Sequence, residues 1–421
     1  MTSLSCLEPP FWVLLVLAAI LLPSLARADD FRLLPSVSQA LQYNDNVFVT
    51  PNNKVHDFIS NTTGSLELFD ATEKLNFDVS AQLTQNLYEN NTRLNSTDGL
   101  GNGSIRYTAN PELSLSGAGS YSRTSQPDQE LLTTGLVLNG VTLDTTTYHA
   151  QADYSLTEKT VASLSYDHLM QHYQSPRFAD LTSDGGTLSL THDLSAYLPQ
   201  AKGLLNMSYT KYSLTGEEIE NYEATTGFSY SLQEKWSIQV AAGLRRTDSS
   251  FETFVPTGFI IGPFIFITGF EEQTQSTSGW GGVGQASLSY RGELTYASLT
   301  ASRDIMPASG QNGTVERTAF ILSADRRLSY DFHGSALTSF FINKSGAGQF
   351  ATAPINFLTF NIGPAVRYEF GRERPAGSQY SRDMFVEASY TFTRVEDKEA
   401  NTNGNRSLFM IRFFAQHALL E

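Results

Sequence analysis

The sequence has almost no cysteine and only one long apolar run. Its single cysteine, Cys6, lies among the first residues, so neither a disulfide framework nor thiol chemistry is expected in the rest of the chain. The apolar run, Phe11–Leu22, has no counterpart later in the chain. It is too short to cross a bilayer as a helix, which takes about 20 residues. A helical membrane protein is therefore excluded.

The apolar run belongs instead to a segment with the layout of a secretory signal peptide. Ala26-Arg27-Ala28 is a small-x-small cleavage site just before Asp29. The residues ahead of the run depart from the pattern, because they carry Glu8 and no Lys or Arg. We predict that residues 1–28 form a cleaved signal peptide and that residues 29–421 form one domain.

Basic charge is also scarce, with 28 Lys and Arg against 43 Asp and Glu and a net charge of -15. A nucleic-acid partner is not expected, because phosphate binding needs a basic surface. Acidic residues gather in two predicted loops, around Glu217–Glu220 and Glu271–Glu272. They are either plain solvated loops or groups that bind lipopolysaccharide through bridging divalent cations.

Aromatic side chains are plentiful, in a chain that is polar on average. Aromatics make up 12% of the residues, with 19 Tyr and 27 Phe, while the mean hydropathy is -0.22. Charged residues are 17%, below the roughly 25% of ordinary soluble proteins. Strands with lipid on one side and water on the other give this combination.

The segment from Met384 to Ala415 shows the alternation most clearly. Met384, Val386, Ala388, Tyr390 and Phe392 share one face, and Phe409, Ile411 and Phe413 continue it after a polar loop. A period of two indicates β-strands. We interpret this segment as the last hairpin of a transmembrane barrel, whose final strand closes the cylinder.

Short turns and longer loops alternate along the whole chain. The turns include 70–74, 109–112, 156–159, 232–235 and 290–293; the loops are 44–55, 90–98, 125–145, 174–183, 215–221, 253–278, 307–315, 345–354 and 395–405. This rhythm predicts an all-β, up-and-down antiparallel transmembrane barrel of about 18 strands, with short periplasmic turns and long outer loops. A sandwich would break the rhythm, and a propeller would show a fixed repeat that the chain lacks.

The segment Gln42–Pro51, reading Gln-Tyr-Asn-Asp-Asn-Val-Phe-Val-Thr-Pro, lies between Leu34–Val37 and the motifs Asp57–Ile59 and Gly64–Leu66. Together they resemble the opening of the Putative beta-barrel porin 2 family. The resemblance implies an outer-membrane barrel tied to exopolysaccharide export or exosortase-type surface systems. One departure is the end of the chain, Ala418–Glu421, which lacks the terminal aromatic of such barrels. The aromatics lie earlier, at Phe413 and Phe414.

No catalytic or cofactor constellation is found. His168 and His172 would lie on a strand, about 13 Å apart at roughly 3.3 Å per residue, which is too far to share a metal ion. Gly99–Gly103 lacks the strand–helix setting of a dinucleotide site and is interpreted as a loop end. We expect no enzyme, no cofactor and no metal.

Charged side chains on the inner face are the first candidate site. They alternate with apolar positions, and lipid contact would cost about 2–4 kcal/mol for Arg or Lys. They either stiffen the wall in pairs or form a field that selects solutes; both signs occur, so strong ion selectivity is not expected. The candidates are Glu67, Asp78, Arg106, Asp153, Arg245, Arg291, Arg367, Glu369, Glu387 and Arg412.

An apolar loop is the second candidate site. It either extends its hairpin or folds inward and narrows the pore, because a patch this apolar is unusual on a surface. Its candidate constriction residues are Phe254, Phe259, Phe264, Phe266 and Phe270.

The function expected from these features is a porin-like channel in the outer membrane of a Gram-negative bacterium. It would serve either exopolysaccharide export or diffusion of small polar solutes. Expected partners are outer-membrane lipid and lipopolysaccharide, the barrel-assembly machinery and, for an export channel, polysaccharide with its periplasmic export proteins. The alternatives are an outer-membrane lipid hydrolase or protease, and a structural or adhesive barrel with a plugged lumen.

Overall fold

The computed structural model describes residues 31–126, 131, 134–136, 141–176, 178–261, 264–308, 314–346, 354–370 and 382–417. Side chains at 253–256, 258–268, 270, 272 and 382 are not described. The predicted signal peptide, residues 1–28, and the chain end, 418–421, lie outside the described residues. Within the described residues, no helix is long and apolar enough to cross a membrane.

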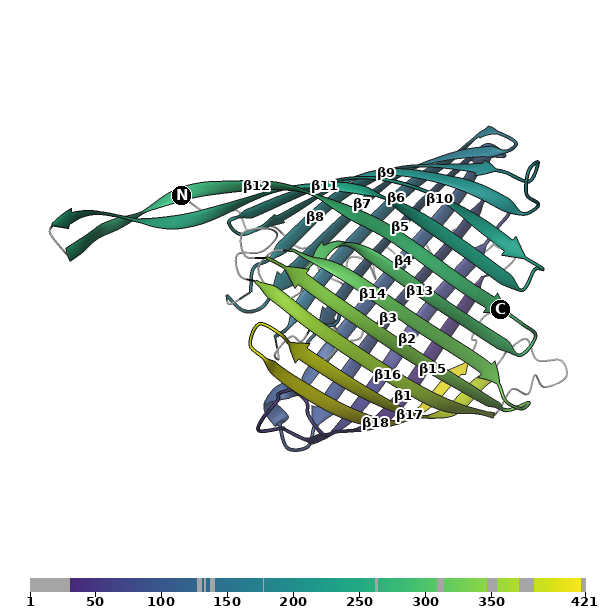
Figure 1. The fold of residues 1–421 in the computed structure, drawn as a ribbon. Helices are drawn as coiled ribbons and strands as arrows, with labels where there is room; N and C mark the ends of the chain where they lie inside the picture. The colour runs from purple at the N-terminus through teal and green to yellow at the C-terminus, as the bar shows by residue number, and fades with distance from the viewer. Residues whose placement is uncertain are drawn as a thin grey trace.

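Eighteen antiparallel strands form one closed barrel (Figure 1), as the turn rhythm predicts. Each strand pairs with the next in sequence, and β1 pairs with β18. The strands are β1 (Arg32–Asn44), β2 (Asp57–Ala71), β3 (Leu75–Tyr88), β4 (Ser96–Asn110), β5 (Leu113–Thr124), β6 (Leu143–Thr157), β7 (Thr160–Tyr173), β8 (Leu181–Asp193), β9 (Ala201–Leu214), β10 (Glu217–Leu232), β11 (Trp236–Ile261), β12 (Phe264–Arg291), β13 (Thr295–Pro307), β14 (Thr314–Arg327), β15 (Phe332–Ser345), β16 (Ile355–Phe370), β17 (Arg382–Asp397) and β18 (Thr402–His417). A 3-10 turn, η2 (Thr92–Leu94), precedes β4.

The outer surface of the barrel is apolar. Alternate side chains of every well-patterned strand point outward; Leu41, Leu83 and Ile411 are 62%, 56% and 61% exposed. Their sequence neighbours point inward and are mostly polar, so the two faces have opposite character. Alternation along a strand fixes this division, and the dyads seen in the sequence are confirmed.

The two ends of the barrel differ in their connections. Tight turns join most of the strands at one end, here called the short-turn end, where β1 begins and β18 ends; the connections at 194–200 and 371–381 are longer. Most connections at the opposite, long-loop end are longer. Two expected features are wrong. The loop at 215–221 is a two-residue turn in which Gly216 has φ +74°, and β10 begins at Glu217. The stretch Gly99–Gly103 lies inside β4 and is not a loop end.

The expected long loop at 253–278 is also wrong, because its backbone is a continuation of β11 and β12. The two strands stay paired from Trp236 and Tyr290 out to Ile261 and Phe264, with one bulge between Thr257 and Gly258. This hairpin leaves the barrel and projects well beyond the long-loop end (Figure 1). Two interpretations of the apolar segment were possible, and its backbone agrees with the extended hairpin.

Candidate functional site: the barrel interior

The ten charged residues predicted to face the lumen lie on the inner face by strand alternation. Their immediate neighbours supply the exposed outer row, including Leu66, Val79, Tyr154, Leu244 and Val366. The inner row also contains the small polar residues that pair with them across the sheet: Ser80 lies opposite Glu67, and Asn76 opposite Arg106. The interior is therefore a polar surface with charges of both signs.

Near the short-turn end, three of the ten candidates form one ion-pair group. Glu387 of β17 accepts from Arg367 Nη2 of β16 and from Arg412 Nη2 of β18, both at 2.9 Å. Phe385 lies beneath both guanidinium groups, at 4.3 and 5.3 Å from its ring centre, and stacks on Phe414 at 4.7 Å. Because Glu387 is buried, the pairing offsets the desolvation of its carboxylate.

The other wall charges are only partly paired. Asp153 accepts from Gln151 and Ser163, and Glu369 lies 3.7 Å from His333. Arg291 lies over the Tyr296 ring at 5.9 Å. Four candidates remain: Arg245 has ion pairs, whereas in the described part of the chain no ion pair joins Glu67, Asp78 or Arg106.

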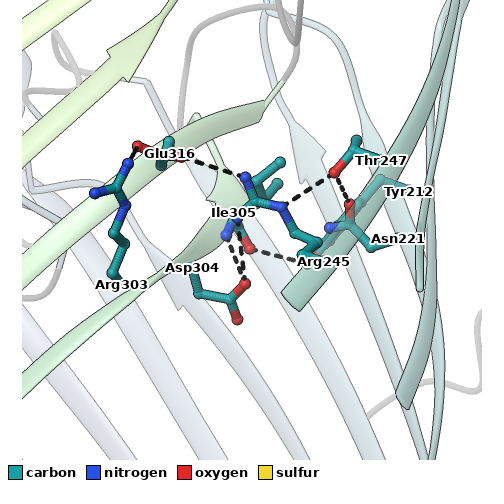
Figure 2. Close-up of polar contacts among 8 residues, drawn as sticks. All are labelled: Tyr212, Asn221, Arg245, Thr247, Arg303, Asp304, Ile305 and Glu316. Carbon is teal, nitrogen blue, oxygen red and sulfur yellow. Dashed lines mark hydrogen bonds and ion pairs between the residues drawn. The ribbon is translucent and has the colours of Figure 1, made fainter. Parts of the chain in front are cut away.

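Arg245 is the most deeply buried charge of the set, at 1% exposure. Its Nε donates to Thr247 Oγ1 at 3.1 Å, and its Nη2 donates to Glu316 Oε2 at 3.3 Å. Asp304 lies 3.9 Å from Nη1. Figure 2 shows the guanidinium reaching from β11 across to β13 and β14. A buried arginine needs such partners, because an unpaired buried charge is strongly destabilising.

Arg245 reaches β13 and β14 because the outer end of that hairpin lies inside the barrel wall. Ile305 of β13 packs with Leu181, Tyr212 and Ile219 from the inner faces of β8, β9 and β10. The Tyr212 hydroxyl donates to the Ile305 carbonyl at 3.4 Å (Figure 2). Two layers of sheet therefore overlap here, and the inner layer reduces the bore.

A second inward element comes from the connection between β5 and β6. Asn343 Nδ2 of β15 donates to the Thr134 carbonyl at 3.0 Å, and Thr359 Oγ1 of β16 donates to the Gly135 carbonyl at 2.6 Å. Leu131 is fully buried among Val49, Val395 and Phe357. The described residues 131 and 134–136 thus cross the interior to the wall of β15–β17, and we call them the inward segment.

Gly135 is required at its place in the inward segment. Its φ is +75°, a conformation that other residues adopt at a cost, and an added Cβ would lie 2.7 Å from the Phe341 Cβ. The sequence predicted a long loop here and not its inward fold. The inner-face polar residues of β15 and β16, which supply its hydrogen bonds, are the signal that points to this fold.

Asp45 and Asn46, the Asp-Asn pair of the segment Gln42–Pro51, hold the first outer loop against the barrel. Asn46 is fully buried; its Nδ2 donates to the carbonyls of Thr50 and Asn405, at 2.8 and 2.9 Å. Asp45 Oδ1 accepts from the Ser407 amide at 2.6 Å. Gly404 permits the contact, since a Cβ there would lie 2.0 Å from the Val49 carbonyl oxygen. The motif therefore has a structural role in tying this loop to β18.

The backbone of the five aromatic constriction candidates belongs to the projecting hairpin of β11 and β12. Their side chains lie outside the description, so a role in narrowing the pore stays a prediction. His168 and His172 lie on β7 as expected, and each bonds an aspartate, Asp184 and Asp180. Among the described residues no group of three or more His, Cys, Asp or Glu side chains could hold a metal ion.

Comparison with known proteins gives likeness of architecture only. No family model and no curated protein matches the chain, so the resemblance of its opening segment is not extended to the whole. Among solved structures, Pseudomonas aeruginosa OccK2 (OpdF) is 10% identical over 94% of this chain and 99% of its own, with a TM-score of 0.45. Acinetobacter baumannii OccAB4 is 9% identical over 93% and 99%, also at 0.45. The ferric-catecholate import receptor Fiu from E. coli K12 is 7% identical over 92% and 82%, at 0.45.

Proposed function

We propose that the chain forms a channel for small polar solutes in the outer membrane of a Gram-negative bacterium. The observation that carries this proposal is the opposition of the two barrel faces. The outside is a continuous apolar surface, and the inside is lined by polar and partly paired charged side chains. A cylinder of 16–18 strands is wide enough to hold an aqueous path.

Aromatic pairs on the outer surface support the membrane setting. Trp236 and Tyr290 meet at 4.7 Å near the short-turn end, while Tyr209 and Tyr222 meet at 5.0 Å nearer the long-loop end. Aromatic girdles at the two interfaces are typical of outer-membrane barrels. In this setting the short turns face the periplasm, and the barrel-assembly machinery and lipopolysaccharide are the expected partners. Residues 1–28 would direct export.

The inward elements favour small solutes over a polymer. The inward segment and the overlapping end of β13–β14 both reduce the bore from the long-loop side. Exopolysaccharide export, which the resemblance of the opening segment implies, would need a continuous path that admits a sugar chain. Diffusion of small solutes past the half-buried guanidinium groups of Arg367 and Arg412 needs less space.

Conductance of the purified barrel in planar bilayers tests the proposal. We expect discrete channels whose conductance is reduced only by small polyethylene glycols, because larger polymers would not enter the narrowed bore. Entry of large polyethylene glycols would favour polysaccharide export. A folded, heat-modifiable barrel without any conductance would overturn the channel and favour a plugged structural role.

A further inference from the structure

The wall between β12 and β13 is joined over a much shorter length than its neighbours. Its ladder has eight residue pairs and ends at Gly284 and Arg303, whereas β13 and β14 share thirteen. Beyond Gly284, β12 continues for twenty residues to its start at Phe264 with no pairing to β13 among the described residues. The outer half of this seam is therefore not closed by backbone hydrogen bonds.

Side chains close the seam instead. Arg303, Ile305 and Glu316 share a strand face with Leu299, which lies exposed on the barrel exterior. Further along, that same face packs against the inner side of β8–β11, through Ile305 and through the Arg245–Glu316 pair. The end of β13–β14 therefore lies inside β8–β11 at this place. The wall here consists of two packed layers that are not joined by a hydrogen-bonded ladder.

Arg245 fills the space between the two layers. It lies opposite Gly281 of β12, where an added Cβ would be 2.5 Å from Arg245 Nη2. On the outer face, Gly282 has open space around it and Trp280 is 75% exposed. The route from the interior to the exterior at this point is blocked by the Arg245 guanidinium with its partners and by the packing of Ile305. At this point neither face of β12 carries a side chain, because Gly281 lies on the inner face and Gly282 on the outer face.

We propose that the outer half of the β12–β13 seam is a lateral portal through which a single-chain amphiphile with a carboxylate head passes from the lumen into the surrounding lipid. This proposal rests on the outer-membrane setting of the proposed function and adds a second class of substrate to the small polar solutes. The head group is set by the chemistry of the seam. Glu316 presents one carboxylate to two guanidinium groups, Arg245 and Arg303. An incoming carboxylate offers the same charge-assisted hydrogen bonds and can replace it.

The apolar tail is set by what lies outside the seam. Release of Glu316 lets the end of β13–β14 move away from β8–β11 at the loss of side-chain contacts, without breaking the ladder that ends at Gly284. A tail then leaves beside Trp280 and Gly282, directly into the outer leaflet. A solute without a tail gains nothing on this route and continues through the bore.

Uptake of radiolabelled dodecanoate tests the portal, in Gram-negative cells that lack their own long-chain fatty acid channel. The locked variant is Ile219→Cys/Ile305→Cys, bridged across the two layers by a cleavable bismaleimide; Cys6 is the sole cysteine otherwise and lies in the predicted signal peptide. The control is Ala297→Cys/Ala324→Cys, neighbours within the β13–β14 ladder. We expect the bridge to abolish uptake in the locked variant only, and cleavage to restore it. Unchanged uptake by the bridged barrel would overturn the portal.

Conductance of the same preparations separates the two proposals. Conductance without dodecanoate uptake leaves the channel standing and overturns the portal. Uptake without conductance supports the portal and overturns the open bore. The failure of both in the unmodified protein overturns both.

A second variant keeps the test independent of cross-linking. Glu316→Gln removes the carboxylate that competes with dodecanoate for the two guanidinium groups. The dodecanoate concentration that gives half-maximal uptake should therefore fall about threefold, which is less than the full free energy of one charge-assisted hydrogen bond. Glu218→Gln is the matched control, because Glu218 pairs with Lys211 on the exterior. Equal half-saturation in Glu316→Gln and the unchanged protein would overturn the competition step.

Discussion

At the residue scale, the fold depends on a few buried polar side chains whose partners lie on distant strands. Arg245, Asn46 and Asn361 each bond groups far away in sequence. Buried polar groups of this kind are costly when one partner is removed, because the other loses its hydrogen bond without regaining water. They are therefore the positions where single substitutions should have the largest effects.

Arg245→Ala should destabilise the barrel by about 3 kcal/mol, the lower end for a broken buried ion pair, because half-buried Glu316 keeps Arg303 as its guanidinium partner. Arg246→Ala is the control: the next side chain points outward and pairs with Asp248 at 3.2 Å while half exposed, so its loss should cost at most about 1 kcal/mol. Urea unfolding in lipid vesicles, followed by tryptophan fluorescence, measures both. Similar stabilities for the two variants would contradict the role assigned to Arg245.

Gly135→Ala should release the inward segment from the wall. The added methyl group would overlap Phe341 and force a left-handed backbone on alanine, at a cost of about 1 kcal/mol or more. We expect higher single-channel conductance with an unchanged amount of folded protein. Gly64→Ala serves as the control, since a Cβ there meets nothing within 4 Å. If both variants conduct alike, the inward segment does not limit flow.

At the element scale, most strands lie wholly in the barrel wall, whereas two hairpins have ends that leave it. These are the outer parts of β11–β12 and β13–β14, which leave the wall in opposite directions. The first hairpin projects outward, and the second passes inside. This divergence explains why the ladder between β12 and β13 is short, since neither strand can follow the other past Gly284.

Deletion of residues 254–270, with a short turn in their place, should leave both conductance and the amount of folded barrel unchanged. The removed hairpin projects away from the mouth, and β10 pairs with β11 only as far as Phe251. Folding is checked by the gel shift of unheated samples, and flow by planar-bilayer recordings. A rise in conductance would show that the aromatic segment does restrict the pore.

Two features were predictable from the sequence: the strand order, from the alternation of short turns and longer loops, and the face on which each side chain lies, from the period of two. The inward face of Arg367, Glu387 and Arg412 follows from parity alone, and so does the outward row of Phe409 and Ile411. The environment of Ile305 does not follow from alternation. Alternation places its side chain on the outward face of β13, but β8, β9 and β10 cover that face. That overlap depends on pairing between distant strands, which local patterns do not encode. The projecting hairpin remained one of two alternatives because its apolar residues do not alternate and Pro256 and glycines interrupt them.

At the scale of the whole molecule, closure depends on the contact between the first and last strands. β1 and β18 share nine residue pairs, from Ser36 with Gln416 to Asn44 with Leu408. All other strands find their partners next in sequence, so this is the one ladder that joins the two ends of the chain. An antiparallel meander becomes a barrel only when this last pairing forms.

Phe413→Asp should block this closure. Phe413 lies in the outward row with Ile411, opposite Gln39 of β1, and contacts Phe370 at 6.1 Å. A carboxylate at this site must lose its water to face lipid, or the strand must shift by one residue and turn every side chain to the wrong face. Neither the native register of β18 nor the register shifted by one residue would then be stable. The protein should therefore fail to reach the folded, heat-modifiable form.

Ser38→Asp provides the matched control, because Ser38 lies on the same seam opposite Phe414 but faces inward. A carboxylate there stays in the polar interior, so the barrel should still close. The fraction of unheated protein that migrates as the compact form measures assembly in both variants. Equal assembly would mean that the lipid-facing row of β18 does not determine closure. Selective loss with Phe413→Asp would show that one charge on the outer face, and not a charge anywhere on the seam, prevents the last ladder from forming.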